Sequence, residues 1–160
     1  MTISKSNADL SWLLEDALFL YHSGKKYGAM LLLVCAIDAL ARQADPTNRK
    51  DYDRFEKFLI SKMRRAGRAQ IHNIYVPKCN QLFSFEYIIY KFLRCPLVHE
   101  GSWLEASDPE EFAVCLDWDT IPHGVKVDSE NNRVILGGEL VMNLLADAVH
   151  HELQSRGIIK

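Results

Sequence analysis

Apolar residues recur with helical spacing near the start of the chain. Between Asn7 and His22 they fall at the i, i+3, i+4 and i+7 positions of one face, as Leu10, Leu13, Leu14, Ala17, Leu18 and Tyr21. A capping side chain, Ser6 or Asn7, precedes this pattern, and Gly24 follows it. The pattern predicts an amphipathic helix that buries this face.

The opposite face of the same helix carries two aromatic residues, Trp12 and Phe19, seven positions apart. Two interpretations are open. An apolar pair that faces away from the core is typical of a second contact surface, and the chain would then be an interaction protein. Aromatic residues that are partly exposed or covered by a loop are also ordinary in globular proteins.

Three further helices are predicted, over residues 26–43, 50–65 and 84–94. The stretch from Tyr27 to Ala41 is apolar nearly all round, so we expect the central, buried helix there. Asp38 is the one charge in this stretch, and a buried carboxylate needs a partner. The uncharged run ends before Asp38, well short of the roughly 20 residues of a membrane span, so we expect no membrane segment.

The last third of the chain alternates between extended and helical patterns. Extended pieces are predicted over residues 112–118, 125–127 and 134–136, the last two as a hairpin, before a final helix over residues 139–156. Residues 69–82 fit either a short helix or an extended piece.

These elements together predict an all-α fold, a helical bundle with a small β-hairpin insertion before the C-terminal helix. We expect a single domain over residues 1–160, with core helices over about 7–101 and the hairpin and closing helix over about 112–157. The length of 160 residues suits one domain with a real core.

Composition narrows the possible functions. With 48% hydrophobic and 25% charged residues the chain is not disordered, and a net charge of −2 excludes a bulk polycationic nucleic-acid binder. A local basic site stays open. Lys62, Arg64, Arg65 and Arg68 gather near the end of the third helix, where they either complement the helix dipole or form a phosphate-binding patch.

Metal and cofactor sites are not predicted. The cysteines at 35, 79, 95 and 115 form no C-x-x-C pair, which fits reduced thiols in a cytoplasmic protein. Asp147, His150 and His151 share helical spacing on the last helix, but they lie in a polar stripe typical of a solvent face and make an incomplete site. We therefore expect neither a metal nor a cofactor.

Candidate chemistry lies in a segment that holds Arg94 and His99, five positions apart and flanked by apolar residues. The fork of an arginine matches phosphate oxygens, and a histidine titrates near neutral pH and can move the proton of a ribose 2′-hydroxyl. Five residues of straight helix amount to about 140° of rotation. Either Pro96 bends the chain between the two residues, or a second subunit completes the site.

The helix before this segment offers a second candidate surface. Tyr87, Tyr90, Lys91 and Arg94 share one face, where rings could stack on bases and cations could meet phosphates. An ordinary amphipathic helix with tyrosines at its boundary explains the same pattern.

The order of these features resembles the HEPN domain family, a helical group found in RNA-targeting toxins and antiviral defence systems. The matching parts are a first helix that ends in the turn Tyr21–Tyr27, a second helix with Asp38, and the segment Leu93–His99. This last segment looks like the R-x4–6-H signature of the family. The likeness covers about residues 8–101.

The resemblance implies a metal-independent endoribonuclease that leaves a 2′,3′-cyclic phosphate. In that case Arg94 would bind the scissile phosphate, His99 would be the acid and base, and Asp38 would orient or pair with Arg94. Further substrate-binding candidates are Tyr87, Tyr90, Lys91 and Glu100. The implied partners are RNA, a second copy of the chain, and an antitoxin or defence protein.

The sequence departs from the family pattern directly after the arginine. Active members often have Asn, Asp or His directly after the arginine, whereas this chain has Cys95 followed by Pro96. Some members carry a tyrosine two residues after the histidine, where this chain has Gly101. Together with the near-neutral charge, Cys95 and Pro96 favour an alternative function. The alternative is a non-catalytic HEPN-like module that binds RNA, a nucleotide or a partner protein.

Overall fold

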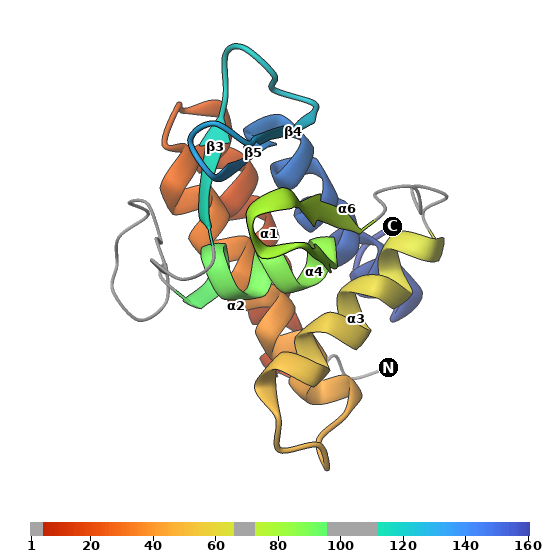
Figure 1. Cartoon of the computed structure of the whole chain (residues 1–160). Coiled ribbons are helices and arrows are strands. Elements are labelled where there is room, and N and C mark those ends of the chain that lie inside the picture. The colour runs from red at the N-terminus through yellow and green to blue at the C-terminus, as the bar shows by residue number, and fades with distance from the viewer. Residues whose placement is uncertain (1–4, 66–72, 96–111) are drawn as a thin grey trace. The chain divides into compact units, whose positions relative to one another are not determined.

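A computed structural model of the chain describes residues 5–65, 73–95 and 112–160 (Figure 1). The chain divides into two compact units. The first comprises residues 1–69 and 144–160, and the second comprises residues 70–143. The expectation of a single domain stays a prediction.

The first unit is helical. It contains α1 (Lys5–His22), α2 (Lys26–Ala44), α3 (Asp51–Arg65) and the later part of α6 (Gly138–Ser155). Helix α1 packs against α2, and α2 packs against α3. The chain reverses between α1 and α2 at Gly24, whose φ of 77° is a left-handed conformation that glycine adopts without strain.

The predicted core face of α1 is partly correct. Leu10, Leu14 and Ala17 are buried, but Leu18 is 38% exposed and does not belong to the core. Trp12 and Phe19 are exposed on the other side of the helix.

Helix α2 is the central helix of this unit, as predicted, and its buried residues are Ala29, Met30, Leu33, Val34, Ala36, Ile37, Leu40 and Ala41. Helix α2 is also long and apolar enough to cross a membrane. The core helix of a soluble protein can meet the same criteria of length and composition. The expectation that the chain has no membrane segment stays a prediction.

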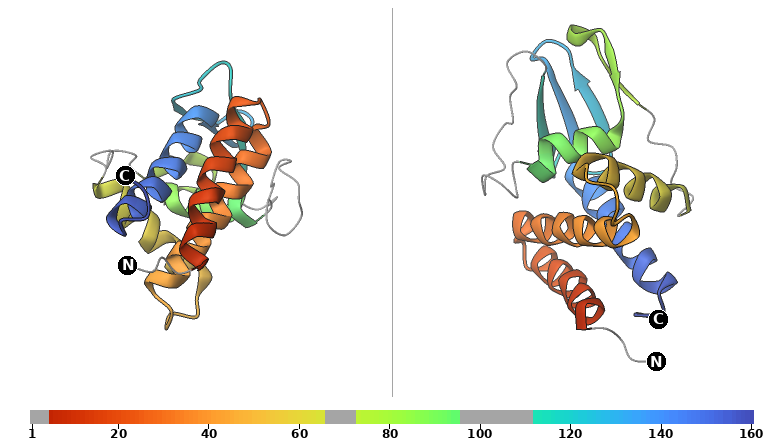
Figure 2. Two further views of the ribbon diagram at one scale, coloured as in Figure 1. Left: turned by 180° about the vertical axis from the view of Figure 1, so that it is seen from behind. Right: turned by 90° about the horizontal axis from the view of Figure 1, so that it is seen from below.

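The second unit holds two small sheets, whose strands are seen from another side in Figure 2. Strands β1 (Ile74–Val76) and β2 (Gln81–Phe83) form an antiparallel hairpin around the short helix η1 (Pro77–Cys79). The other sheet has the order β3-β5-β4, where β3 is Ala113–Asp117, β4 is Val125–Asp128 and β5 is Arg133–Gly137. Strand β5 pairs parallel with β3 and antiparallel with β4.

The prediction of an all-α fold with one hairpin is therefore wrong, and the fold is mixed α/β. The sequence pattern did anticipate extended pieces at β3, β4 and β5. It did not anticipate that β3 would join β5 in a parallel sheet, because this pairing brings Ala113 beside Arg133 and depends on contacts far apart along the chain. Strands β1 and β2 have only three residues each, too few for a clear alternating pattern.

Aromatic contacts hold the second unit together around Phe112. Its ring lies 4.8 Å from that of Phe83 and 5.0 Å from that of Phe92, measured between centroids. Phe83 ends strand β2, and Phe92 lies on the helical segment that follows it. The core of this unit therefore fixes the segment that carries the predicted phosphate-binding arginine.

Candidate functional site

The helical segment before the predicted Arg–His motif begins as an α-helix and continues as a π-helix. Helix α4 covers Phe85–Ile88, and the hydroxyl of Ser84 caps it by accepting a hydrogen bond from the Tyr87 N–H at 3.1 Å. The π-helix η2 covers Ile89–Arg94. At its end the Cys95 N–H donates to the carbonyl of Tyr90, five residues earlier, as the wider π-turn requires. Such π-helical turns are rare in proteins, and many of those that do occur lie at functional sites.

Arg94 is the last residue of the π-helix and is only 6% exposed. The central carbon of its guanidinium lies 5.2 Å from the centroid of the Tyr90 ring. At that distance the ring attracts the cation and limits its rotamers. The position of the Arg94 guanidinium is therefore restricted by a residue of its own helical segment.

On the predicted surface of tyrosines and cations, each cation lies over the ring of a tyrosine four residues earlier, Arg94 over Tyr90 and Lys91 over Tyr87. The ammonium of Lys91 lies 5.6 Å from the Tyr87 ring and 5.5 Å from the Phe92 ring. The Tyr87 ring in turn stacks on Phe83, with centroids 5.7 Å apart. Tyr87, Tyr90 and Lys91 are half-buried, so part of each side chain stays open to solvent.

The remaining predicted site residues lie on α2 or outside the described residues. Asp38 is half-buried on α2, in the first unit, whereas Arg94 belongs to the second unit. Asp38 lines a hollow of 560 Å³ together with Cys35, Ala39, Arg42, Gln43 and Pro46. His99 and Glu100 lie outside the described residues.

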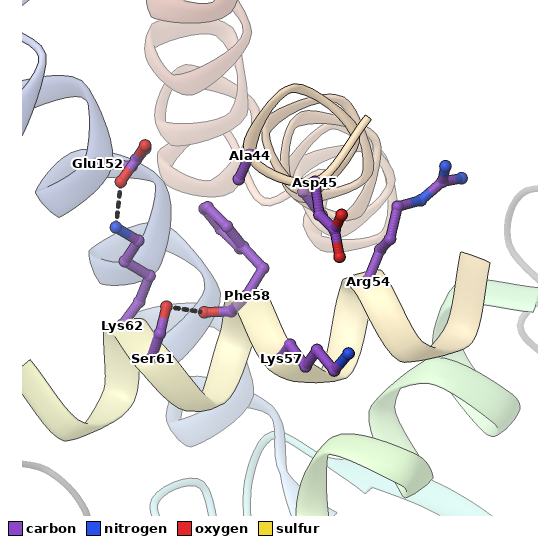
Figure 3. A pocket seen from close by; sticks show the side chains of 9 residues that line it. Ala44, Asp45, Arg54, Lys57, Phe58, Ser61, Lys62 and Glu152 are labelled. Atoms are coloured by element: carbon purple, nitrogen blue, oxygen red, sulfur yellow. Dashed lines mark hydrogen bonds and ion pairs between the residues drawn. The ribbon is translucent and has the colours of Figure 1, made fainter. Parts of the chain in front are cut away.

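A charged pocket in the first unit was missed by sequence reasoning (Figure 3). It has a volume of 180 Å³, and its walls come from the end of α2, from α3 and from α6. The buried ammonium of Lys62 donates to the carboxylate of Glu152, and the Phe58 ring lies between this pair and Asp45. Lys62 is thus neither part of an exposed phosphate patch nor a solvated end of α3.

Glu152 is the centre of a polar network at this pocket. Besides Lys62, the Nε of Arg156 donates to its carboxylate at 2.7 Å, and Arg156 also donates to the side chain of Gln43. Burial alone would raise the pKa of Glu152, but the hydrogen bonds from Lys62 and Arg156 outweigh it, so the pKa lies below its ordinary value. Because Lys62 lies on α3 and Glu152 on α6, this network ties the two helices together.

Within the described part of the chain, no three His, Cys, Asp or Glu side chains are grouped so that they could hold a metal ion. Asp147, His150 and His151 on α6, the incomplete set of ligands noted in the sequence, form no such group either.

Comparison with known proteins gives a match to a protein family. The model of the family described as Rv1289 matches residues 10–157. The chain belongs to the Rv1289 family. No curated protein and no solved structure matches it.

The Rv1289 match extends from α1 to the end of α6, and so it includes both units and the positions of Asp38, Arg94 and His99. The family's name states no activity. The resemblance of this Rv1289-family chain to the HEPN family therefore stays a prediction.

Proposed function

We propose that the chain is a metal-independent endoribonuclease of the HEPN type. In this proposal Arg94 binds the scissile phosphate, His99 moves the protons, and Asp38 orients or pairs with Arg94. The observation that carries the proposal is the π-helix that ends at Arg94. A rare helical turn ends at the residue that the R-x4–6-H resemblance marks as the phosphate ligand, which is where a functional distortion is expected.

The surroundings of Arg94 also suit an anion ligand. The Tyr90 ring holds the guanidinium, so less side-chain entropy is lost when a phosphate binds. A guanidinium that is shielded from water attracts a phosphate more strongly than one in bulk solvent. Tyr87, Tyr90 and Lys91 are half-buried beside it, and their open parts offer rings and a cation to neighbouring nucleotides.

The proposed reaction needs no metal. His99 takes the proton of a ribose 2′-hydroxyl, and the 2′-oxygen attacks the adjacent phosphorus to form a new P–O bond. The bond between phosphorus and the 5′-oxygen breaks, and this oxygen takes a proton from the imidazolium of the same or of a second copy. The products are a 2′,3′-cyclic phosphate and a 5′-hydroxyl. The proposal includes a homodimer in the cytoplasm, in a toxin or defence setting with an antitoxin or partner protein.

The burial of Arg94 favours a second candidate function. At 6% exposed, its guanidinium offers little surface to a substrate. A non-catalytic HEPN-like module that binds RNA, a nucleotide or a partner protein does not need Arg94 to reach a scissile phosphate. In this case Arg94 stabilises the second unit by its contact with Tyr90.

Cleavage of labelled total RNA in EDTA separates the two candidates. We expect the wild-type chain to cut RNA and leave cyclic-phosphate ends, and His99→Ala to cut at least about 10²-fold more slowly. His151→Ala is the matched control, because it removes an exposed imidazole on α6 and should cut like the wild type. Arg94→Lys keeps the charge but loses the planar fork, and we expect slower cleavage by a protein that melts like the wild type.

Absence of cleavage by the folded wild-type dimer would contradict the ribonuclease proposal. Circular dichroism and sedimentation establish the folded and dimeric state of each variant. Filter binding of the same RNA, without cleavage, would then support the binding module.

A further inference from the structure

The outer face of α1 carries two exposed aromatic side chains with two carboxylates between them. Trp12 is 62% and Phe19 70% exposed, and Glu15 and Asp16 are exposed as well. At 100° per residue the four side chains lie within an arc of about 100° around the helix. We call these four residues the α1 face.

Most of the surface of the α1 face is open to solvent in the described part of the chain. Neither ring takes part in an aromatic contact there, and neither carboxylate takes part in a hydrogen bond or ion pair. Two large rings in water are a source of binding energy, since each apolar Å² that a partner buries contributes about 25 cal/mol. Tryptophan in particular is enriched among the residues that dominate protein interfaces.

We propose that the α1 face binds a basic amphipathic helix of another protein. The apolar stripe of that helix would cover Trp12 and Phe19, and its lysines or arginines would meet Glu15 and Asp16. Seven residues of helix span about 10.5 Å, which is two turns. A partner helix with apolar residues at i and i+7 therefore matches the spacing of the two rings along α1.

The charge of the α1 face argues against other occupants. A second copy that used the same face would bring Glu15 and Asp16 against their own counterparts, and like charges across an interface are repulsive. The phosphates of RNA and the headgroups of anionic lipids would be repelled for the same reason. The proposal is independent of the ribonuclease proposal, because the α1 face lies in the first unit and uses neither Arg94 nor His99.

A pair of synthetic peptides tests this proposal on the full chain. The probe is a fluorescein-labelled amphipathic peptide of about 14 residues, four helical turns, built from leucine and lysine. Its matched control has glutamate in place of every lysine. We expect fluorescence anisotropy to show binding of the lysine peptide alone, and weaker binding as salt concentration rises.

Variants of the α1 face make the test specific. We expect Trp12→Ala/Phe19→Ala to weaken binding of the lysine peptide about tenfold or more. We expect Glu15→Lys/Asp16→Lys to lose the lysine peptide and gain the glutamate peptide. Glu56→Lys/Glu139→Lys, which changes the net charge equally at half-buried carboxylates elsewhere, should leave binding of the lysine peptide within about twofold of wild type.

Several results would overturn the proposal. They are no binding of the lysine peptide, equal binding of both peptides, and binding that the α1-face variants leave unchanged. Sedimentation that shows a dimer lost in Trp12→Ala/Phe19→Ala would assign the face to a second copy instead. Flotation with phosphatidylglycerol vesicles that these substitutions abolish would assign it to a membrane.

Discussion

In the helical unit, the buried ion pair between Lys62 and Glu152 joins side chains that are 90 residues apart. In the second unit, two carboxylates bind groups within five residues of themselves. Asp117 accepts from three backbone N–H groups just after it, and Asp128 accepts from Asn131 and from Arg133. All three carboxylates have a lowered pKa, but the first depends on tertiary assembly and the other two on a local turn.

This difference predicts where a substitution is felt. The Lys62 ammonium reaches Glu152 only when α3 and the later part of α6 are assembled, whereas Arg156 lies four residues from Glu152. The partners of Asp117 and Asp128 are supplied by chain that is already adjacent. Loss of the long-range pair should therefore destabilise the whole helical unit, whereas loss of a local carboxylate should affect one turn.

The largest effect is expected for Glu152→Gln. It leaves the buried ammonium of Lys62 without its carboxylate, and removal of one partner from a buried pair typically costs about 3 kcal/mol of the free energy of unfolding. Urea unfolding followed by circular dichroism measures this loss. The double variant Lys62→Met/Glu152→Leu should regain part of it, because the buried ammonium is then absent while Arg156 still lacks its carboxylate. If the double variant lost the sum of the two single effects, the pair would not be coupled.

The pH dependence of that variant has a defined sign. The pKa of Glu152 is lowered in the folded chain, so its contribution is complete above the ordinary carboxyl pKa of 4.5 and is lost as pH falls toward the folded pKa. The gap in stability between wild type and Glu152→Gln should therefore narrow on acidification.

The second prediction concerns close packing in the β-sheet unit. A Cβ on Gly137 would lie 2.4 Å from the carbonyl oxygen of Pro122, while a Cβ on Gly124 would lie 3.8 Å from Ile121. Gly137→Ala must push the backbone of the loop away, and we expect a loss of about 2 kcal/mol. Gly124→Ala, in the same loop, should cost less than about 1 kcal/mol. Equal losses in thermal melts would contradict this account.

Local patterns in the sequence predict the long helices well. The expected spans 7–22, 26–43, 50–65 and 139–156 differ by one or two residues from α1, α2, α3 and α6. Helical periodicity and caps are properties of neighbouring residues, which a single sequence contains. The parallel pairing of β3 with β5 is not such a property, and the fold class was wrong for this reason.

The candidate site divides in the same way. Tyr87 with Lys91 and Tyr90 with Arg94 are four positions apart, so their contacts follow from helical spacing. The π-helix itself has no distinct sequence pattern and was predicted as ordinary helix. The partner of Lys62 could not be found from the sequence, because Glu152 lies on another helix and any of many carboxylates would have served.

The smallest predicted effect concerns Asp128, which joins β4 to β5 through Asn131 and Arg133. Hydrogen bonds from these side chains lower its pKa from 3.8 to about 2. Its contribution to stability is therefore complete above pH 3.8 and is lost as pH falls toward 2. Asp128→Asn should melt slightly below the wild type at pH 6, and this gap should close toward pH 2.

Glu130→Gln is the matched control for this turn, because Glu130 is exposed and has no hydrogen bond or ion pair in the described part of the chain. We expect the control to melt like the wild type at every pH. A gap for Asp128→Asn as large as that for Glu152→Gln would break the comparison between the two units, because a carboxylate bound within its own turn would then matter as much as one in a buried long-range pair.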